Sequence, residues 1–505
     1  MSPPTAAPAR NLVREAGGLA GARLGVRVLG IAVGWVVARV IGPEGLGQLS
    51  LPNLMLAVAP FLTLGFADGL VRELPLAEGQ APEQRRSLLA ASWAAGLLTG
   101  LAVLLVAAGY QAVAGESIRD SRLYWLAVLA GLAHMAFKVS LSSLTGSRRI
   151  KELALLQVLQ GLLRAGLVLI LLFTMPASAQ VYALHTGVAL SLTGSLVWAA
   201  RHGAVSRPHF DARALGRLGR SGPPLALASL LLMLLIVGDR LVLSRVLEPQ
   251  ALGIFEQGVL IRDGLLLLPA VLLTLLIPDY SARQGDPARR PGLLTDVARQ
   301  SGLVAVGTPL LLGLTLLQLP WLFALLLPRF TPGMPVLQLA VLGMCPIFLS
   351  YILVSLLMSE GRAVHVGLLA LVCLGLLLGL DLRPLAVWQP WLERVLAHGP
   401  PVAGLERALA GALTALGAFW LFSLGILLGN ARRLGLGAKL VLGWIAPSLL
   451  LSLAALAGLE QGWLQGWNPW VNLGFALAGG LFLATYERRS GQLGKLWRAR
   501  RAVKS

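Results

Sequence analysis

The sequence predicts an all-α polytopic membrane protein with about fourteen transmembrane helices. Of its 505 residues, 56% are hydrophobic and only 13% are charged, whereas about 25% of the residues of a soluble domain are charged. Apolar runs of roughly 20 residues, enough to cross about 30 Å of hydrocarbon, recur along the whole chain. These runs are continuously apolar, whereas the strands of a membrane barrel alternate between polar and apolar residues. A helical bundle is therefore expected.

The expected spans, in chain order, are 17–41, 48–71, 88–109, 123–143, 153–174, 181–200, 223–246, 254–278, 301–326, 336–358, 363–382, 404–429, 439–459 and 470–486. No short apolar core with a small-residue cleavage site precedes the first span, so we expect a permanent helix there. Cys345 and Cys373 lie inside apolar runs, so we expect neither a disulfide framework nor a metal site, and no cofactor.

The positions of Lys and Arg predict the orientation of the bundle. Twenty-nine of these residues fall in loops and termini on one side of the expected spans, and six fall on the other. Positive residues in short loops stay on the cytoplasmic side, so both termini are expected to be cytoplasmic. This bias explains most of the net charge of +19. Nucleic-acid binding is not expected, and the basic tail after Tyr486 is expected to lie on anionic lipid headgroups.

One short stretch occurs twice. ARVIGPEGLGQLSL (residues 38–51) is followed 206 positions later by SRVLEPQALGIFEQ (residues 244–257). The first copy links expected helices one and two, and the second links helices seven and eight. Six crossings separate the copies, so the two halves are parallel repeats related by an axis along the membrane normal. Gly and Pro suit a structural turn at the outer ends of the hairpins; the turn residues are Gly42, Pro43, Gly47, Pro249 and Gly253.

These residues carry a resemblance to a known family. ARVIGPEGLGQLSL with LGFADGLVREL, and GDRLVLSRVLEPQALGIFEQ with LLIPDYSARQG, are similar to signatures of the polysaccharide-type flippases in the multidrug/oligosaccharidyl-lipid/polysaccharide exporter superfamily. Positions that match are Arg39, Gly42, Pro43, Gly47, Arg72, Asp239, Arg240, Gly253 and Pro278. The second copy departs from the pattern at Glu248 and Gln250, and the resemblance is poor after about residue 383.

The resemblance implies a fold of two parallel six-helix lobes arranged as a V, plus two C-terminal helices. We expect one lobe at 1–208, the second at 209–430, and helices 13 and 14 with the basic tail at 431–505. It also implies a non-enzymatic flippase of a bacterial-type cytoplasmic membrane, which moves a polyprenyl-pyrophosphate-linked oligosaccharide between leaflets by alternating access. The implied partners are the lipid-linked glycan, membrane lipids, and polysaccharide polymerases or glycosyltransferases.

Charged residues inside the expected helices are the candidate site, because each costs about 2.5–3.5 kcal/mol at a helix centre and so faces a cavity or a partner. Arg23 and Arg27 are four residues apart on a face that continues through Gly30 and Gly34. Two arginines there could bind pyrophosphate oxygens, with Arg164 and Arg262 as further candidates. The alternative is that Arg23 and Arg27 extend to lipid headgroups and the glycines pack helices.

Four acids are candidates for coupling transport to a proton or sodium gradient: Asp68, Asp239, Glu256 and Asp263. Simple ion pairing is the alternative for Arg262 and for the pair Asp239 and Arg240, and helix packing is the alternative for His134 and His185. No GxxxxGK[ST] loop occurs in the sequence, so we do not expect ATP hydrolysis.

Three other functions are also compatible with the sequence. A multidrug or cation antiporter of the same superfamily would be expected to place acids and aromatic residues where the first helix here has arginine. A flippase of lipid-linked peptidoglycan precursors shares the two helices beyond twelve. A membrane glycosyltransferase or ligase would need an outer catalytic loop, and the segment 383–403 contributes Glu393 and His398 without paired carboxylates.

Overall fold

The computed structural model describes residues 7–76, 82–114, 120–147, 149–266, 280, 290–381, 389–397, 404–431 and 438–461. Every regular element within these ranges is a helix. The helices of the first half are α1 (Ala7–Gln48), α2 (Ser50–Val58), η1 (Ala59–Thr63), α3 (Phe66–Leu76), α4 (Pro82–Ala114), α5 (Ser121–Gly146), α6 (Ile150–Thr174), η3 (Ala177–Ala179) and α7 (Gln180–Arg201). Those of the second half are α8 (Ala212–Ser221), α9 (Pro223–Val237), α10 (Asp239–Val246), α11 (Pro249–Leu265), α13 (Arg290–Leu326), η4 (Pro328–Gly333), α14 (Met334–Leu342), α15 (Met344–Ser359), α16 (Ala363–Asp381), α17 (Gln389–Leu396), α18 (Leu405–Ala431) and α19 (Ala438–Glu460).

The predicted helical membrane fold is confirmed. Among the described residues, nine helices are long and apolar enough to cross a membrane, and two bent pairs raise the number to eleven. The count of fourteen stays a prediction, because span 470–486, residues 267–278 with Pro278, and the basic tail lie outside the described residues. The expected loop 383–403 contains the short helix α17. Residues 383–388 and 398–403 of this loop also lie outside the described residues.

The second expected span consists of two parts that are bent by 45° relative to each other. The first part is α2 with η1, and the second part is α3. Pro60 lies in η1, and a proline lacks the N–H that would continue an α-helix. Leu64 and Gly65 then take left-handed φ angles of 50° and 83°. Gly65 lies so close to Gly222, before α9, that a Cβ on Gly222 would come within 1.9 Å of the Gly65 carbonyl oxygen. The bend therefore brings the first half of the chain against the second.

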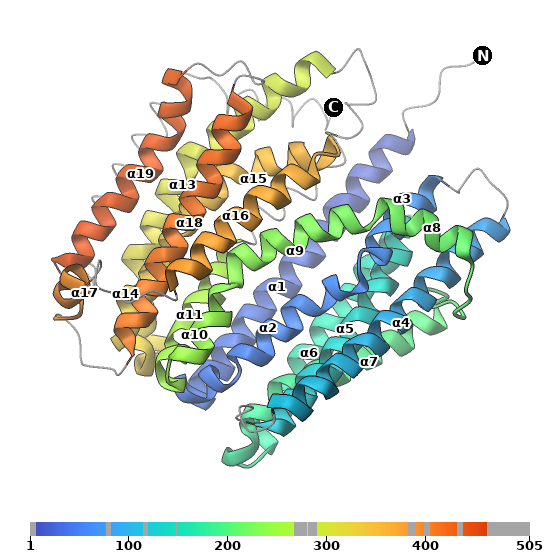
Figure 1. Cartoon of the computed structure of the whole chain (residues 1–505), viewed down its shortest axis with the longest axis horizontal. Helices are drawn as coiled ribbons and strands as arrows, with labels where there is room; N and C mark the ends of the chain where they lie inside the picture. The colour runs from blue at the N-terminus through green and yellow to red at the C-terminus, as the bar shows by residue number, and fades with distance from the viewer. Residues whose placement is uncertain are drawn as a thin grey trace.

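The helices form two groups that meet along α1, α2, α3 and α8–α11. In Figure 1, α4–α7 lie on one side and α13–α19 on the other, with α1 and α9–α11 between them. We call α1–α7 the first group and α9–α19 the second group. The main contact between the groups runs along α1 and α11, and α8 packs against α3 and α4 of the first group. This is the two-lobed arrangement that the repeat predicts.

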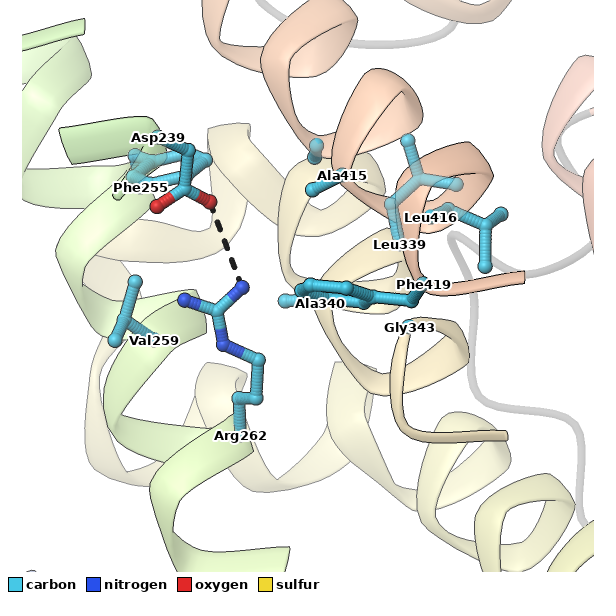
Figure 2. Close-up of a pocket in the computed structure, with 11 residues that line it drawn as sticks. Asp239, Phe255, Val259, Arg262, Leu339, Ala340, Gly343, Ala415, Leu416 and Phe419 are labelled. Carbon is cyan, nitrogen blue, oxygen red and sulfur yellow. Dashed lines mark hydrogen bonds and ion pairs between the residues drawn. The ribbon is translucent and has the colours of Figure 1, made fainter. Parts of the chain in front are cut away.

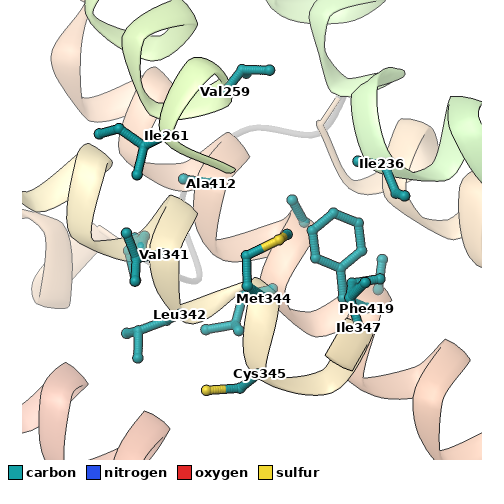
Figure 3. Packing of buried hydrophobic residues seen from close by; sticks show 14 of the residues in the cluster. Ile236, Val259, Ile261, Val341, Leu342, Met344, Cys345, Ile347, Ala412 and Phe419 are labelled. Carbon is teal, nitrogen blue, oxygen red and sulfur yellow. The ribbon is translucent and has the colours of Figure 1, made fainter. Parts of the chain in front are cut away.

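The two groups differ in their interiors. The second group has one continuous apolar core built around α11, α14, α15 and α18, and Figure 3 shows part of it, including Met344, Ile347 and Phe419. The apolar residues of the first group are divided among several smaller clusters.

The two copies of the repeated turn differ at one position. Gly42 has a φ of 72° and a ψ of −177°, a left-handed backbone that favours glycine. Its counterpart Glu248 has a φ of −67° and a ψ of 154°, which any residue adopts, and Pro249 follows as the first residue of α11. The departure from the family pattern at Glu248 is therefore accommodated by a different backbone conformation of the second turn.

Candidate functional site

The middle of α1 carries an open, basic surface. Arg23 is half-buried, and its Nε donates a hydrogen bond of 3.0 Å to the Gln157 side chain of α6. Arg27, one turn further, is exposed. A Cβ on Gly25 or Gly30 would meet no atom within 4 Å. The face predicted from the spacing of Arg23 and Arg27 is therefore open beside Arg27.

Arg164 extends this basic surface from α6. Val26 packs against Gly161, one turn beyond the contact between Arg23 and Gln157, so α1 and α6 run parallel. Arg164 lies seven residues beyond Gln157, which is about 10 Å along the helix at 1.5 Å per residue. The Arg164 side chain is exposed at this level. Arg23, Arg27 and Arg164, which we call the three arginines, therefore follow one another from the N-terminal end of α1 toward the turns.

Other basic groups of the first group lie near Arg164. His134 of α5 and His185 of α7 lie close to Arg164. His134 Nδ1 is 3.2 Å from the Leu56 carbonyl oxygen. Lys138, one turn from His134, forms an ion pair of 2.9 Å with Asp68 of α3. Within the described residues, none of the three arginines has an ion-pair partner, so this region carries uncompensated positive charge.

The described part of the second group holds four buried charges, which we call the charge quartet: Asp239, Arg240, Glu256 and Arg262. Gly238 separates α9 from α10, so Asp239 and Arg240 begin α10 and face α11. Arg240 Nε is 3.2 Å from Glu256 Oε1, and Arg262 Nη1 is 3.5 Å from Asp239 Oδ2. None of these side chains is more than 6% exposed. The quartet therefore pairs each acid with an arginine and is neutral overall.

A small cavity lies beside the quartet. Figure 2 shows Arg262 reaching Asp239 at one side of it, with the Phe419 ring of α18 nearby. The Arg262 guanidinium carbon lies 5.7 Å from the centre of that ring. Among the described residues, the Arg262 Nε and Nη2 atoms have no hydrogen-bond partner. Arg262 thus contacts a carboxylate and the face of an aromatic ring. In this conformation it lies apart from the three arginines.

Asp263 follows Arg262 on α11 but is exposed. It lies two turns from Glu256 on the same face of the helix, as the spacing predicts. Glu256 accepts a hydrogen bond from Ser50 of α2, a contact that connects the two groups. Of the four candidate acids, Asp68, Asp239 and Glu256 are paired with a cation, and Asp263 is the one at the surface.

Some contacts of the site were not predicted from the sequence. Gln157 and Phe419 are ordinary residues of apolar helices, and only the packing shows that they contact Arg23 and Arg262. Ser50 could have been found, because it lies 206 positions before Glu256, which is the offset of the repeat.

Solved structures with a similar fold are membrane transporters. A structure described as lipid II flippase MurJ in an inward closed conformation matches with a TM-score of 0.61 and 14% identity, covering 93% of this chain and 99% of its own. An inward-facing multidrug resistance transporter of the MATE family and the MOP superfamily matches with a TM-score of 0.58 and 13% identity, covering 82% and 98%. A MOP superfamily transporter from Pyrococcus furiosus, described as having a binding pocket of reverse polarity, matches with a TM-score of 0.59 and 14% identity, covering 84% and 95%.

Among curated proteins, no sequence match was found. At 13% to 14% identity, the structural matches establish the fold alone. The family model described as polysaccharide biosynthesis protein matches residues 12–281, which is more than half of the chain and includes both copies of the turn, the three arginines and the charge quartet. The chain therefore belongs to the polysaccharide biosynthesis protein family and has the helical fold of the MOP superfamily transporters.

Proposed function

We propose that this protein is a flippase that moves a polyprenyl-pyrophosphate-linked oligosaccharide from the cytoplasmic to the outer leaflet for the synthesis of a cell-surface polysaccharide. The prenyl tail stays in lipid while the charged head crosses between the two helix groups. The protein provides the path for this charged head group, and we propose that it catalyses no reaction.

The observation that carries this proposal is the difference in charge between the two groups. Arg23, Arg27 and Arg164 lie along α1 and α6 without a carboxylate partner in the described structure, and two of them are exposed. In the second group, each buried arginine is paired with an acid. Guanidinium groups bind phosphate oxygens through paired hydrogen bonds, so a pyrophosphate is the ligand that these arginines favour. A cationic drug would be repelled.

The distribution of basic residues supports an orientation with both termini in the cytoplasm of a bacterial-type cell. The arginines of α8 and the N-terminal end of α1 would then face the cytoplasm, and the two turns would face outward. We assign the lobes to residues 1–208 and 209–430, with residues 431–505 as an addition to the second. Polysaccharide polymerases or glycosyltransferases would act before or after the flippase on the same glycan.

A second candidate is a flippase of lipid-linked peptidoglycan precursors. The similarity to the lipid II flippase structure over 93% of the chain favours it, and such a substrate also carries a pyrophosphate. The three arginines suit both substrates, so the glycan alone distinguishes them. The family model favours the polysaccharide precursor.

The test uses the purified chain in liposomes with a fluorescent polyprenyl-pyrophosphate oligosaccharide and, in parallel, fluorescent lipid II. Transport is measured as arrival of the label in the opposite leaflet. The double variant Arg27→Gln and Arg164→Gln is expected to reduce transport at least tenfold. Arg201→Gln, an exposed arginine at the end of α7, is the matched control. Parental transport by a folded double variant, or drug efflux without movement of either lipid, would contradict the proposal.

Coupling to an ion gradient is proposed to involve the four acids Asp68, Asp239, Glu256 and Asp263. Three of them are paired with cations, and a pair that breaks and reforms during transport can bind or release a cation. The expected result is that replacing these carboxylates by amides removes the response of transport to an imposed proton or sodium gradient. If the response of the quadruple variant equals that of the parent, the acids do not couple transport.

A further inference from the structure

One residue of α15 is accessible where the rest of that part of the helix is buried. Between residues 344 and 357, every residue is buried except Tyr351, which is half-buried. Its ring packs against the apolar core of the second group. Its carbonyl oxygen accepts a hydrogen bond from the Ser355 hydroxyl, whereas its own hydroxyl has no partner among the described residues. Tyr351 therefore presents an unpaired hydroxyl at an accessible point of the second group.

Tyr351 lies close to Arg27 of the first group. Arg27 is one turn before Ile31, where α1 meets α11, because a Cβ added to Gly264 of α11 would lie 3.2 Å from the Ile31 side chain. On the N-terminal side of this contact, Arg27 is exposed. Arg27 and Tyr351 are therefore two accessible polar groups that lie near each other on different helix groups, next to a point where those groups meet.

The neighbouring arginine of α1 is held in place by the first group. Arg23 Nε donates its hydrogen bond to the Gln157 side chain of α6 at 3.0 Å, which leaves the terminal nitrogens of Arg23 for another partner. Arg23 and Arg27 are one turn apart, about 6 Å along the helix. A ligand with two linked anionic groups can therefore reach both arginines. A hydroxyl close to Arg27 can donate a further hydrogen bond to the same ligand.

We propose that Tyr351 binds the pyrophosphate of the substrate together with Arg27, by donating a hydrogen bond from its hydroxyl to a phosphate oxygen. This contact rests on the proposed function, because it adds a residue of the second group to the site for the same head group. Arg23 and Arg27 bind the two phosphates from the first group, and Tyr351 binds from the second. A neutral donor suits this position, since it adds a hydrogen bond without the cost of burying a further charge.

The test measures the binding of inorganic pyrophosphate to the purified full chain in detergent, by calorimetric titration. Tyr351→Phe removes only the hydroxyl and keeps the ring in the core. We expect this variant to bind pyrophosphate about tenfold more weakly than the parent, the effect of one hydrogen bond to a charged group. The thermal midpoint of the unliganded variant should equal that of the parent, because the hydroxyl has no partner to lose. A purely structural role of Tyr351 would lower the midpoint and leave the affinity unchanged.

Two comparisons show whether the hydroxyl and Arg27 act on the same ligand. Tyr110→Phe is the matched control and should bind as the parent does, because Tyr110 of α4 is 48% exposed and belongs to the first group. In an Arg27→Gln background, Tyr351→Phe should weaken binding less than about threefold, because a phosphate that Arg27 no longer holds is not kept within reach of the hydroxyl. Inorganic phosphate and phosphatidylglycerol carry one phosphate each and cannot reach both arginines, so they should bind at least about tenfold more weakly than pyrophosphate.

An affinity of Tyr351→Phe within twofold of that of Tyr110→Phe would overturn the inference. A parent that does not bind pyrophosphate, or that binds a single phosphate equally well, would also overturn it. Transport of the fluorescent polyprenyl-pyrophosphate oligosaccharide separates this result from the proposed function, and Tyr351→Phe should raise its half-saturating concentration about tenfold. Normal transport at an unchanged half-saturating concentration would refute the contact alone. A tenfold loss of pyrophosphate affinity in Tyr351→Phe, with a parent that moves no such lipid, would refute the proposed transport alone.

Discussion

Removing one arginine of the charge quartet is expected to destabilise the protein strongly. Arg262→Met leaves the Asp239 carboxylate, which is fully buried, without its partner at 3.5 Å. At that distance and an effective dielectric constant of about 20, the attraction between two unit charges is about 5 kcal/mol. Breaking a buried pair in this way typically costs about 3–5 kcal/mol, because a charge remains in an apolar environment.

Removing both partners is expected to cost less than removing one. In the double variant Asp239→Leu and Arg262→Met, no charge is left unpaired, and apolar replacement of a buried pair is often close to neutral. We expect the double variant to lose less than about 2 kcal/mol, well below the sum of the two single losses. With single losses of about 3–5 kcal/mol each, the coupling energy between the two positions would then be at least about 4 kcal/mol.

The assay is unfolding of the detergent-purified protein, followed by the fluorescence of its 13 tryptophans. Arg394→Met is the matched control, because its pair with Glu460 is closer, at 2.6 Å, but exposed, and an exposed pair contributes less than about 1 kcal/mol. If the double variant lost as much as the two single variants together, within about 0.5 kcal/mol, the two charges would be independent and the quartet would not be a set of ion pairs.

Three further outcomes test the packing. Asp120 caps α5, and Asp120→Ala should cost about 1 kcal/mol of unfolding free energy. Burial alone would raise the pKa of Asp120, but hydrogen bonds from a tyrosine hydroxyl and two backbone N–H groups lower it. The stabilisation by this carboxylate is therefore present above about pH 4 and is lost as the pH falls through the lowered pKa. The measurement is the unfolding midpoint as a function of pH. Lys138→Met leaves Asp68 unpaired in a partly exposed site and should cost about 1 kcal/mol in the same assay. Gly222→Ala, directly after α8, should cost about 1–3 kcal/mol of unfolding free energy by forcing α8 away from α3. Gly216→Ala within α8 adds a Cβ that meets no atom within 4 Å and should be neutral or stabilising.

The large features of this protein could be predicted from the sequence because they depend on composition and period. Continuous apolar runs cannot satisfy their backbone polar groups in lipid except as helices, so the helical membrane fold follows from the runs alone. The repeat at an offset of 206 predicts two parallel lobes, because an even number of crossings separates its copies. The spacing of Arg23 and Arg27 predicts one face of α1, which is where the structure has them.

The pairing of the charges in the quartet could not be predicted from the sequence. Asp239, Glu256 and Arg262 are separated along the chain, and whether an acid faces a cavity or an arginine depends on how α10 and α11 pack. The sequence left both possibilities open for Arg262. The structure pairs it with Asp239 and so separates it from the three arginines, with which it shares only its residue type.

By itself, then, the sequence determined that this chain is a helical membrane protein made of two parallel repeats with arginines in the first helix. Only the tertiary structure decided that the repeated turns contact each other, that Ser50 binds Glu256, and that the buried arginines Arg240 and Arg262 are paired with acids, whereas the three arginines of the first group have no such partner among the described residues. The physical reason is distance along the chain. Helix formation and membrane insertion depend on neighbouring residues, whereas a contact between positions 206 apart depends on the packing of both groups together.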